Sequence, residues 1–291
     1  MKKTGAQVLC EGLIHHGVEK IFGIPGGAIL PLYGTLSEYP ELDHILVRHE
    51  QGASHAADGF SRVSGKTGVC FATSGPGATN LITGMATAMM DSSPMIAITG
   101  QVSRPGIGKD SFQEIDITGA SLPVTKHNYL VMNAHEIPRV LKEAFIIANT
   151  GRPGPVLIDI PRDVFMEEFD FDNNFWNEEI EILGYNPPKF ADNSKIDKAI
   201  KLIQESNKPV ILAGHGVIIS RAYNELMELA EKAQIPVVTT LLGISSFPEN
   251  HVLSLSFPGM HGVAWASLAL DQADLVIAIG SRFDDRITGD T

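Results

Sequence analysis

Residues 68–90 read GVCFATSGPGATNLITGMATAMM, and this stretch decides the fold. Its apolar run Gly68–Thr73 predicts a buried strand, and the glycines and proline of residues 74–77 predict a tight turn at its end. The small and apolar residues that follow, Ala78–Met90, predict a helix. A buried strand that passes at once into a helix is the repeating unit of a parallel sheet covered by helices.

The same alternation of short apolar strands and helices extends along the chain on both sides. In the first half it predicts strands at Lys20–Gly23, Ile45–Val47, Met95–Thr99 and Val156–Ile160, with helices at Ala6–His16, Ala28–Ser37, Gln51–Val63 and Ile137–Ala148. In the second half it predicts strands at Val210–Ala213, Val237–Thr239 and Leu275–Ile279, with helices at Ile196–Glu205, Tyr223–Ala233 and Gly262–Leu270. The sequence therefore predicts an α/β protein with two doubly wound parallel-sheet units.

An acidic segment, residues 166–192, separates the two halves and contains eight acidic residues and one base, Lys189. Such a charge run can dock a partner, but a solvated connection between domains is its commoner role. We therefore expect a first domain at 1–165, an acidic linker at 166–192 and a second domain at 193–291. Because the second domain ends just after a strand and a Gly-rich loop, we expect its C-terminal part to be missing.

Composition excludes several classes of protein. The 291 residues include 34 acidic and 22 basic side chains, a formal net charge of −12, with no basic cluster for nucleic acid or an anionic membrane surface. No apolar run reaches about 18 residues, so we expect no transmembrane helix. The two cysteines, Cys10 and Cys70, lie apart in apolar stretches and suggest neither a disulfide framework nor a metal site. We expect a globular protein of the cytoplasm.

Four strand ends in the first domain are rich in glycine and polar residues, and ligands of open α/β sheets bind beyond such ends. They are Pro25–Gly27, Arg48–Gly52, Thr73–Asn80 and Gly100–Gln101, and we expect them to meet at one edge. Glu50 is the most informative residue among them, because it follows a strand and begins a helix whose N-terminus favours a carboxylate. A helix-capping acid and a catalytic acid are the two interpretations.

The second domain has partial nucleotide-binding patterns. Gly214-His215-Gly216 follows one strand, and the segment 280–286, with two arginines, follows another. Such strand ends suit a nucleotide pyrophosphate, although surface ion pairs explain the arginines equally well. No histidine pair has metal-ligand spacing, and the nucleophile elbow of α/β-hydrolases and the phosphate loop of P-loop NTPases are both absent from the sequence.

Nine short motifs in order along the chain carry a family resemblance. They are FGIPGGA at 22–28, RHEQGA at 48–53, TSGPGATN at 73–80, TGQV at 99–102, FQE at 112–114, KHNY at 126–129, GRPGPV at 151–156, GMHG at 259–262 and RFDDR at 282–286. With these motifs the chain resembles the large catalytic subunits of acetolactate synthases, which are thiamine-diphosphate-dependent enzymes. The resemblance implies a first domain that binds the pyrimidine ring of thiamine diphosphate and a central FAD-binding domain, here incomplete.

The resemblance also implies roles for individual residues. Glu50 matches the glutamate that performs acid–base work on the aminopyrimidine, with Gln113 and Gly27 beside the reaction centre. Positions that match the thiamine diphosphate site are Gly26, Gly27, Glu50, Ser74, Pro76, Asn80 and Gln113. Positions that match the FAD surface are Arg152, Gly214, Gly216, Thr240, Leu241, Gly259, Met260, His261, Gly280, Arg282 and Arg286. Positions that match the substrate channel are Ala28, Arg104, Lys109 and Phe112.

The implied reaction condenses two pyruvates, or pyruvate and 2-oxobutanoate, into 2-acetolactate or 2-aceto-2-hydroxybutyrate with loss of CO₂, in the synthesis of valine, leucine and isoleucine. The implied assembly is a homodimer or homotetramer with a possible small regulatory subunit. Two departures stand out: Ser103 replaces a proline common in the family, and the Gly-Asp-Gly motif that accompanies the Mg²⁺ ligands is absent. The chain holds no metal ligands of its own by this comparison. An inactive remnant that only binds or dimerises, and another flavin-bearing relative such as pyruvate oxidase, are the alternatives.

Overall fold

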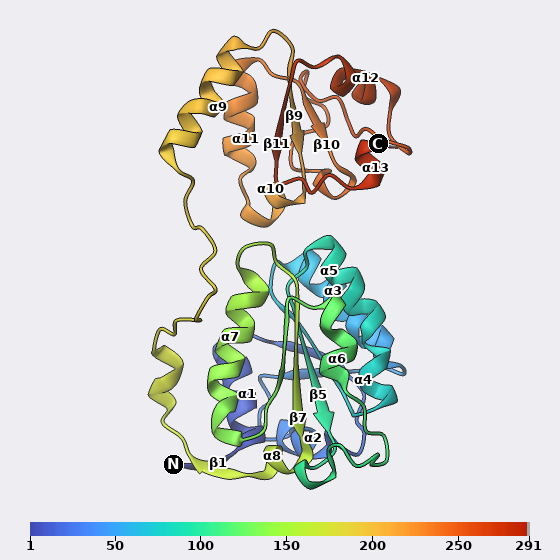
Figure 1. Ribbon diagram of the computed structural model, residues 1–291, viewed down its shortest axis with the longest axis vertical. Helices are drawn as coiled ribbons and strands as arrows, with labels where there is room; N and C mark the ends of the chain where they lie inside the picture. The colour runs from blue at the N-terminus through green and yellow to red at the C-terminus, as the bar shows by residue number, and fades with distance from the viewer. Residues whose placement is uncertain (290–291) are drawn as a thin grey trace. The chain divides into compact units, whose positions relative to one another are not determined.

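The computed structural model describes residues 1–289, and the chain divides into two compact units, Met1–Pro188 and Lys189–Thr291 (Figure 1). Both units contain a parallel sheet with helices on its faces, so the predicted α/β class is confirmed. No helix within residues 1–289 is long and apolar enough to cross a membrane.

The first unit is built on a six-stranded parallel sheet with the order β3-β2-β4-β5-β7-β6. Its strands are β2 (Lys20–Gly23), β3 (Asp43–Leu46), β4 (Gly68–Ala72), β5 (Met95–Gln101), β6 (His127–Leu130) and β7 (Pro155–Pro161). Every residue of β4, β5 and β7 is buried, which explains their unbroken apolar runs.

Helices cover both faces of this sheet (Figure 1). On one face lie α1 (Gly5–His15), α2 (Leu30–Leu36), α7 (Ile137–Asn149) and α8 (Arg162–Met166), which share a core that includes Leu9, Leu141 and Phe165. On the other lie α3 (Glu50–Ser64), α4 (Pro76–Asn80), α5 (Ile82–Asp91) and α6 (Ile117–Ser121), around a core that includes Ala57 and Met85. The sheet is therefore doubly wound, as the alternation predicted.

Two differences from the sequence prediction in this unit have a clear local cause. The helix expected over Ala78–Met90 is divided into α4 and α5, because the Leu81 N–H bonds to the Ala78 carbonyl at 3.1 Å and tightens the turn between them. Strand β6 was not predicted, since its His-Asn-Tyr-Leu sequence has no apolar run. It is an edge strand of the sheet, so it pairs with one strand only, β7, and it is only partly buried. Such a strand does not need an unbroken run of apolar residues.

The acidic segment begins as part of the first unit rather than as a connection. Residues Glu168–Asp170 form β8, which pairs antiparallel with β1 (Lys2–Thr4). Trp176, which follows it, is 7% exposed and belongs to the core on the α1 side of the sheet. The division between the units falls after Pro188, so most of the predicted linker 166–192 packs on the first unit.

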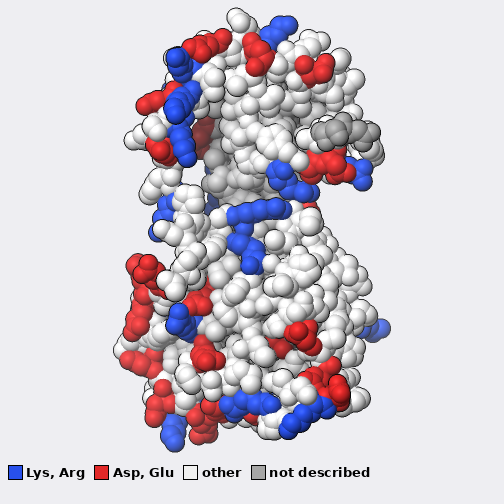
Figure 2. Space-filling model, viewed as in Figure 1, with Lys and Arg blue, Asp and Glu red and all other residues white. Residues whose placement is uncertain are grey.

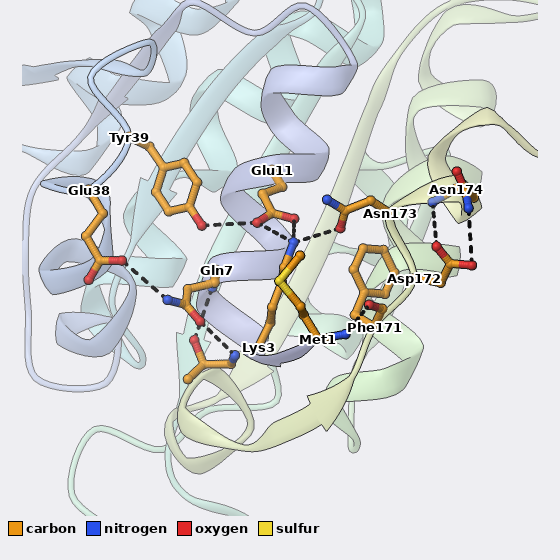
Figure 3. Close-up of polar contacts among 11 residues, drawn as sticks. Met1, Lys3, Gln7, Glu11, Glu38, Tyr39, Phe171, Asp172, Asn173 and Asn174 are labelled. Carbon is orange, nitrogen blue, oxygen red and sulfur yellow. Dashed lines mark hydrogen bonds and ion pairs between the residues drawn. The ribbon is translucent and has the colours of Figure 1, made fainter.

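Polar contacts fasten this segment to the N-terminus, as Figure 3 shows. The Lys3 ammonium donates to Glu11 at 2.6 Å and to Asn173 at 2.7 Å, and it lies 5.7 Å from the centre of the Phe171 ring. The Met1 amino group donates to the Phe171 carbonyl at 3.3 Å. Figure 2 shows acidic side chains along the edge of the first unit where this segment runs. Together, β8, Trp176 and these contacts form a strap, residues 168–176, across α1.

His16, at the end of α1, makes stability depend on pH. Its ring stacks on Phe145 with centroids 4.2 Å apart, its Nε2 is buried without a partner, and burial lowers its pKa to about 4. The neutral ring is therefore favoured in the folded state, so this contribution is present above pH 6.5 and lost as pH falls toward 4, by about 1.4 kcal/mol per pH unit at most. We expect His16→Phe to reduce the acid sensitivity of unfolding in urea between pH 7 and pH 4.5. The exposed His135→Gln is the control, and equal sensitivity in both variants would contradict the expectation.

The second unit contains a three-stranded parallel sheet with the order β10-β9-β11. Its strands are β9 (Pro209–Ala213), β10 (Val237–Thr239) and β11 (Leu275–Ile279), and its helices are α9 (Asn193–Glu205), α10 (His215–Ser220), α11 (Tyr223–Ala233), α12 (Ala264–Gln272) and α13 (Asp285–Thr288). Helix α12 begins two residues later than predicted, because Gly262 is in a turn where a Cβ would lie 2.3 Å from the Phe257 carbonyl oxygen.

Candidate functional site

The polar strand ends of the first unit lie at one edge of the sheet. Strands β3, β2, β4 and β5 are successive neighbours and all parallel, so their carboxyl ends meet as the sequence predicted. One detail differs: Gly100 and Gln101 lie inside β5 rather than beyond it. A Cβ on Gly100 would lie 2.8 Å from the Ile29 nitrogen, so this strand packs against the backbone that follows β2.

Glu50 lies at this edge as the first residue of α3. The helix is capped by His49, whose Nδ1 accepts from the Gln51 N–H at 3.1 Å, so Glu50 is not needed as the cap. Its Oε2 accepts from Asn80 Nδ2 at 3.0 Å, while no described donor reaches its Oε1. Oε1 therefore remains able to accept a hydrogen bond.

Glycines keep the space around Glu50 open. A Cβ on Gly77 would lie 3.3 Å from Glu50 Oε1 and 2.7 Å from the Thr73 methyl group. Gly26 packs in the same way on Thr73, whose Oγ1 accepts from the Ala28 N–H at 3.1 Å. Gly27 is exposed, and nothing lies within 4 Å of where its Cβ would be. The ends of β2 and β4 therefore form a cradle beside one free carboxylate oxygen.

A loop after β5, residues 102–116, brings Gln113 to the same edge. Gln113 has φ +57°, and a Cβ on Gly75 would lie 2.6 Å from its carbonyl oxygen, so the loop rests on the turn after β4. Gly75 itself has φ +60°, which only glycine adopts readily. The side chains of Gln113 and Lys109 are exposed, as is Phe112 at 87%. These three predicted residues thus project from one loop.

Two arginines assigned to ligand surfaces have partners within the chain. Arg104 forms ion pairs with Asp163 at 2.7 Å and Glu167 at 2.8 Å. Arg152 donates to Ser92 Oγ at 2.8 Å and to the carbonyl oxygens of Met89 and Met90 in the last turn of α5. Arg104 thus anchors the start of the loop after β5, and Arg152 caps the C-terminal end of α5. The guanidinium group of each arginine already has partners within the chain.

In the second unit the glycine-rich strand ends pack backbone against backbone. A Cβ on Gly214 would lie 2.3 Å from the Gly280 carbonyl oxygen, and one on Gly216 would lie 2.6 Å from Gly280 Cα. The segment after β10 joins them, since the Thr240 N–H donates to the Ala213 carbonyl at 2.8 Å and Leu241 follows. Three predicted strand ends therefore come together at the carboxyl edge of this sheet.

The loop that holds the remaining predicted FAD residues lies against α13. Gly259 has φ +97°, and a Cβ there would lie 2.0 Å from the Arg286 carbonyl oxygen. Met260 is 69% exposed and its sulfur lies 3.7 Å from an Arg286 nitrogen. Arg282 pairs with Asp284 at 3.3 Å. Arg286 and Met260 thus lie side by side at the surface, while His261 follows in the same exposed loop.

Gly280 offers a test of this backbone contact. It has φ +64°, and a Cβ would also lie 2.7 Å from Gly216 Cα. We expect Gly280→Ala to lower the free energy of unfolding of the second unit by roughly 2–3 kcal/mol, from backbone strain and the clash together. Hydrogen exchange of β9 and β11 in urea measures it. Gly289→Ala, with φ +70° but open space around it, isolates the strain, and an equal loss in both variants would refute the contact's role.

From the sequence, Thr73 and Gln101 were identified only as members of polar strand ends, and Asp159 was not identified. The Thr73 hydroxyl accepts from the Ala28 N–H and so holds the chain after β2. Gln101 and Asp159 form a buried hydrogen-bonded pair at 2.8 Å behind the edge. A single acid within the apolar run of β7 was the signal that could have identified Asp159. Among residues 1–289 no group of three metal-ligating side chains occurs.

Comparison with known proteins matches both units to one class of enzyme. Residues 3–120 match the family model of the thiamine pyrophosphate enzyme N-terminal TPP-binding domain, and residues 196–291 match the model of the central domain. The chain belongs to the thiamine pyrophosphate enzymes. The fold class and the cofactor implied by the motifs, thiamine diphosphate, agree with this assignment.

Within that class, the chain is similar to acetolactate synthases. It is 53% identical over 289 residues to the acetolactate synthase large subunit of Corynebacterium glutamicum, covering 99% of this chain and 46% of that protein. It is 54% identical over 286 residues to the acetolactate synthase of Mycobacterium bovis, covering 98% and 46%, and 51% identical over 294 residues to the large subunit of Porphyra purpurea, covering 99% and 49%. The chain spans about half the length of these relatives, and the family expected from the motifs is confirmed.

Proposed function

We propose that this chain is the portion of an acetolactate synthase that binds the pyrimidine end of thiamine diphosphate and activates it with Glu50. The observation that carries the proposal is the cradle at the carboxyl edge of the first sheet. There Glu50 keeps Oε2 on Asn80 at 3.0 Å and Oε1 free beside Gly77, where any larger residue would fill the space. A flat polar ring fits such a cradle, and its nitrogen atoms match a carboxylate that can exchange a proton.

The residues around the cradle have different roles in the proposed site. Asn80 fixes the orientation of the Glu50 carboxylate, so that only Oε1 is available for proton exchange. Gly26, Gly27, Ser74 and Pro76 supply backbone and small side chains along the walls, and the exposed Gln113 lies over the turn. When bound, thiamine diphosphate supplies the nucleophilic carbon that attacks a 2-oxo acid. The chain contributes position, a proton acceptor and exclusion of water.

We further propose that the second unit binds part of FAD. The strand ends at Gly214, Gly216 and Gly280 pack backbone against backbone and carry no side chains, so an extended ligand such as a dinucleotide could approach the main chain closely there. Thr240, Leu241, Met260 and Arg286 are at the same edge or in the adjoining loop and would contact the rest of the flavin. The Mg²⁺ that accompanies the cofactor's diphosphate would take its ligands from elsewhere in the complete enzyme.

The reaction we propose for the complete enzyme is the carboligation of two pyruvates, or of pyruvate and 2-oxobutanoate, in branched-chain amino-acid synthesis. This is a transferase reaction. Phe112 and Lys109, exposed on the loop, and Ala28, buried where the chain leaves β2, would line the path of the 2-oxo acids. A homodimer or homotetramer, a small regulatory subunit and a cytoplasmic location belong to the same proposal, and the buried thiols of Cys10 and Cys70 suit a reducing compartment.

A chimera tests this function. The chain would be joined to the part of the C. glutamicum subunit that it does not cover, and supplied with thiamine diphosphate, Mg²⁺, FAD and pyruvate. We expect acetolactate and CO₂ as products. Acetyl phosphate or acetate in place of acetolactate would favour the pyruvate-oxidase alternative. The 291-residue chain assayed alone would decide whether it turns over pyruvate or only binds.

A further inference from the structure

A buried carboxylate lies directly behind the site, on β7. Asp159 is 1% exposed, within a strand whose residues are all buried. One of its oxygens accepts from Thr99 Oγ1 at 2.6 Å, and the other accepts from Gln101 Nε2 at 2.8 Å. Burial raises its pKa to about 7, with the nearby negative charge of Asp116 adding to the effect. Burial of a carboxylate lowers the stability of the folded state, and the hydrogen bonds from Thr99 and Gln101 offset part of that cost.

Gln101 carries this contact to both ends of the loop 102–116. Its Nε2 also donates to the Ile115 carbonyl at 2.9 Å, and its Oε1 accepts from the Val102 N–H at 2.9 Å. All the hydrogen-bonding groups of the side-chain amide except one lone pair are therefore used. Because Val102 and Ile115 flank the loop, one side chain ties its two ends together, and Asp159 fixes that side chain from the interior.

The loop between these ends is stiffened by its own contacts. The carboxylate of Glu114 accepts from the N–H groups of Gly108 and, at 2.9 Å, of Ser111. The Ser111 hydroxyl donates to the Gly106 carbonyl at 2.7 Å. A loop with so many internal bonds moves as one piece, so a shift at its base is passed to its tip, where Gln113 rests against Gly75.

We propose that Asp159 is a positioning residue: through Gln101 it fixes the loop 102–116 and so the place of Gln113 against the turn at Gly75. The inference rests on the proposed function for the role of Gln113, but the Asp159–Gln101–Ile115 connection itself does not. A carboxylate suits this task because it accepts a hydrogen bond from each neighbouring donor, Thr99 and Gln101. An asparagine could keep both contacts, because the Thr99 hydroxyl can also accept from an N–H₂ group, whereas a leucine can keep neither.

Hydrogen exchange on the intact 291-residue chain at pH 8 tests the connection without any cofactor. We expect Asp159→Leu to raise amide exchange in residues 104–116 by tenfold or more, while exchange in α7 is unchanged. Gln101→Leu should do the same, and the double variant should add little, because both break one connection. Asp58→Leu, which removes another buried carboxylate, 5% exposed and paired with Arg62 on α3, is the matched control and should leave exchange in the loop unchanged. Unchanged loop exchange in folded Asp159→Leu and Gln101→Leu variants would overturn the proposal.

Kinetics of the chimera test the consequence for the site. We expect Asp159→Leu to lower kcat for acetolactate formation about tenfold with the KM for pyruvate changed less than twofold, since a displaced Gln113 affects the reaction centre more than ground-state binding. An equal loss in Asp58→Leu would show that removal of any buried carboxylate lowers activity and would overturn the positioning role. An inactive wild-type chimera would refute the proposed function, and the exchange result would still stand by itself.

Discussion

Glu50→Gln is expected to lower acetolactate formation by the chimera by about 10²–10⁴-fold, the usual contribution of a positioned acid–base group. The glutamine has the same shape and retains an oxygen that can accept from Asn80 at the present 3.0 Å, so the cradle should keep its form. It cannot take up a proton at the position of Oε1, and it also lacks the negative charge. Steady-state kinetics with pyruvate, together with fluorescence titration of thiamine diphosphate, measures the change.

A matched acid separates this effect from a change in net charge. Glu19 is exposed at the start of β2, at the opposite edge of the same sheet, and pairs with Lys66 at 2.7 Å. Glu19→Gln should keep nearly full activity. If Glu50→Gln retained more than a tenth of wild-type kcat, Glu50 would be a structural acid of α3 and the proposed role would be abandoned.

Trp176→Ala is expected to lower the free energy of unfolding of the first unit by about 3–5 kcal/mol, the range for removal of a large buried aromatic side chain. Trp176 is 7% exposed, it packs against Phe171 with ring centroids 5.4 Å apart, and its ring fills the space over Gly12. Its loss would free the strap 168–176 from α1. Urea denaturation followed by far-UV circular dichroism measures the change.

Phe190, which follows the division between the units, provides the comparison. It is 90% exposed, so Phe190→Ala should change stability by less than about 0.5 kcal/mol. If Trp176→Ala were as mild as this control, the strap would be a loosely attached connection, as the charge pattern first suggested.

The strands that the sequence indicates most clearly are those buried on both faces. The run at β4 is apolar at every position, the run at β7 is apolar except for Asp159, and a parallel sheet explains both. Strand β6 and the pairing of β1 with β8 could not be found in this way. Each lies at an edge or at the surface and depends on a partner far along the chain, and short edge strands have no distinctive pattern.

The site likewise has features that the sequence predicts and features that it does not. Glu50, Gly77 and Asn80 were found because helix starts and glycine-rich turns have local signatures. The sequence could not predict that Arg104 and Arg152 have partners within the chain, because these partners, Asp163 and Ser92, lie far from them in sequence. Motif matching gives the place of a side chain but not the contacts that already satisfy it.

The pairing of β1 with β8 sets the order of events during synthesis. Met1 and Phe171, joined across this pair, are 170 positions apart. At a translation rate of roughly 5–20 residues per second, β1 waits on the order of ten to thirty seconds before its partner leaves the ribosome. During this time the apolar side of α1 lacks Trp176 and remains open to other chains. The first unit therefore completes its folding late, and nascent chains stalled before about residue 176 should be the ones that chaperones retain.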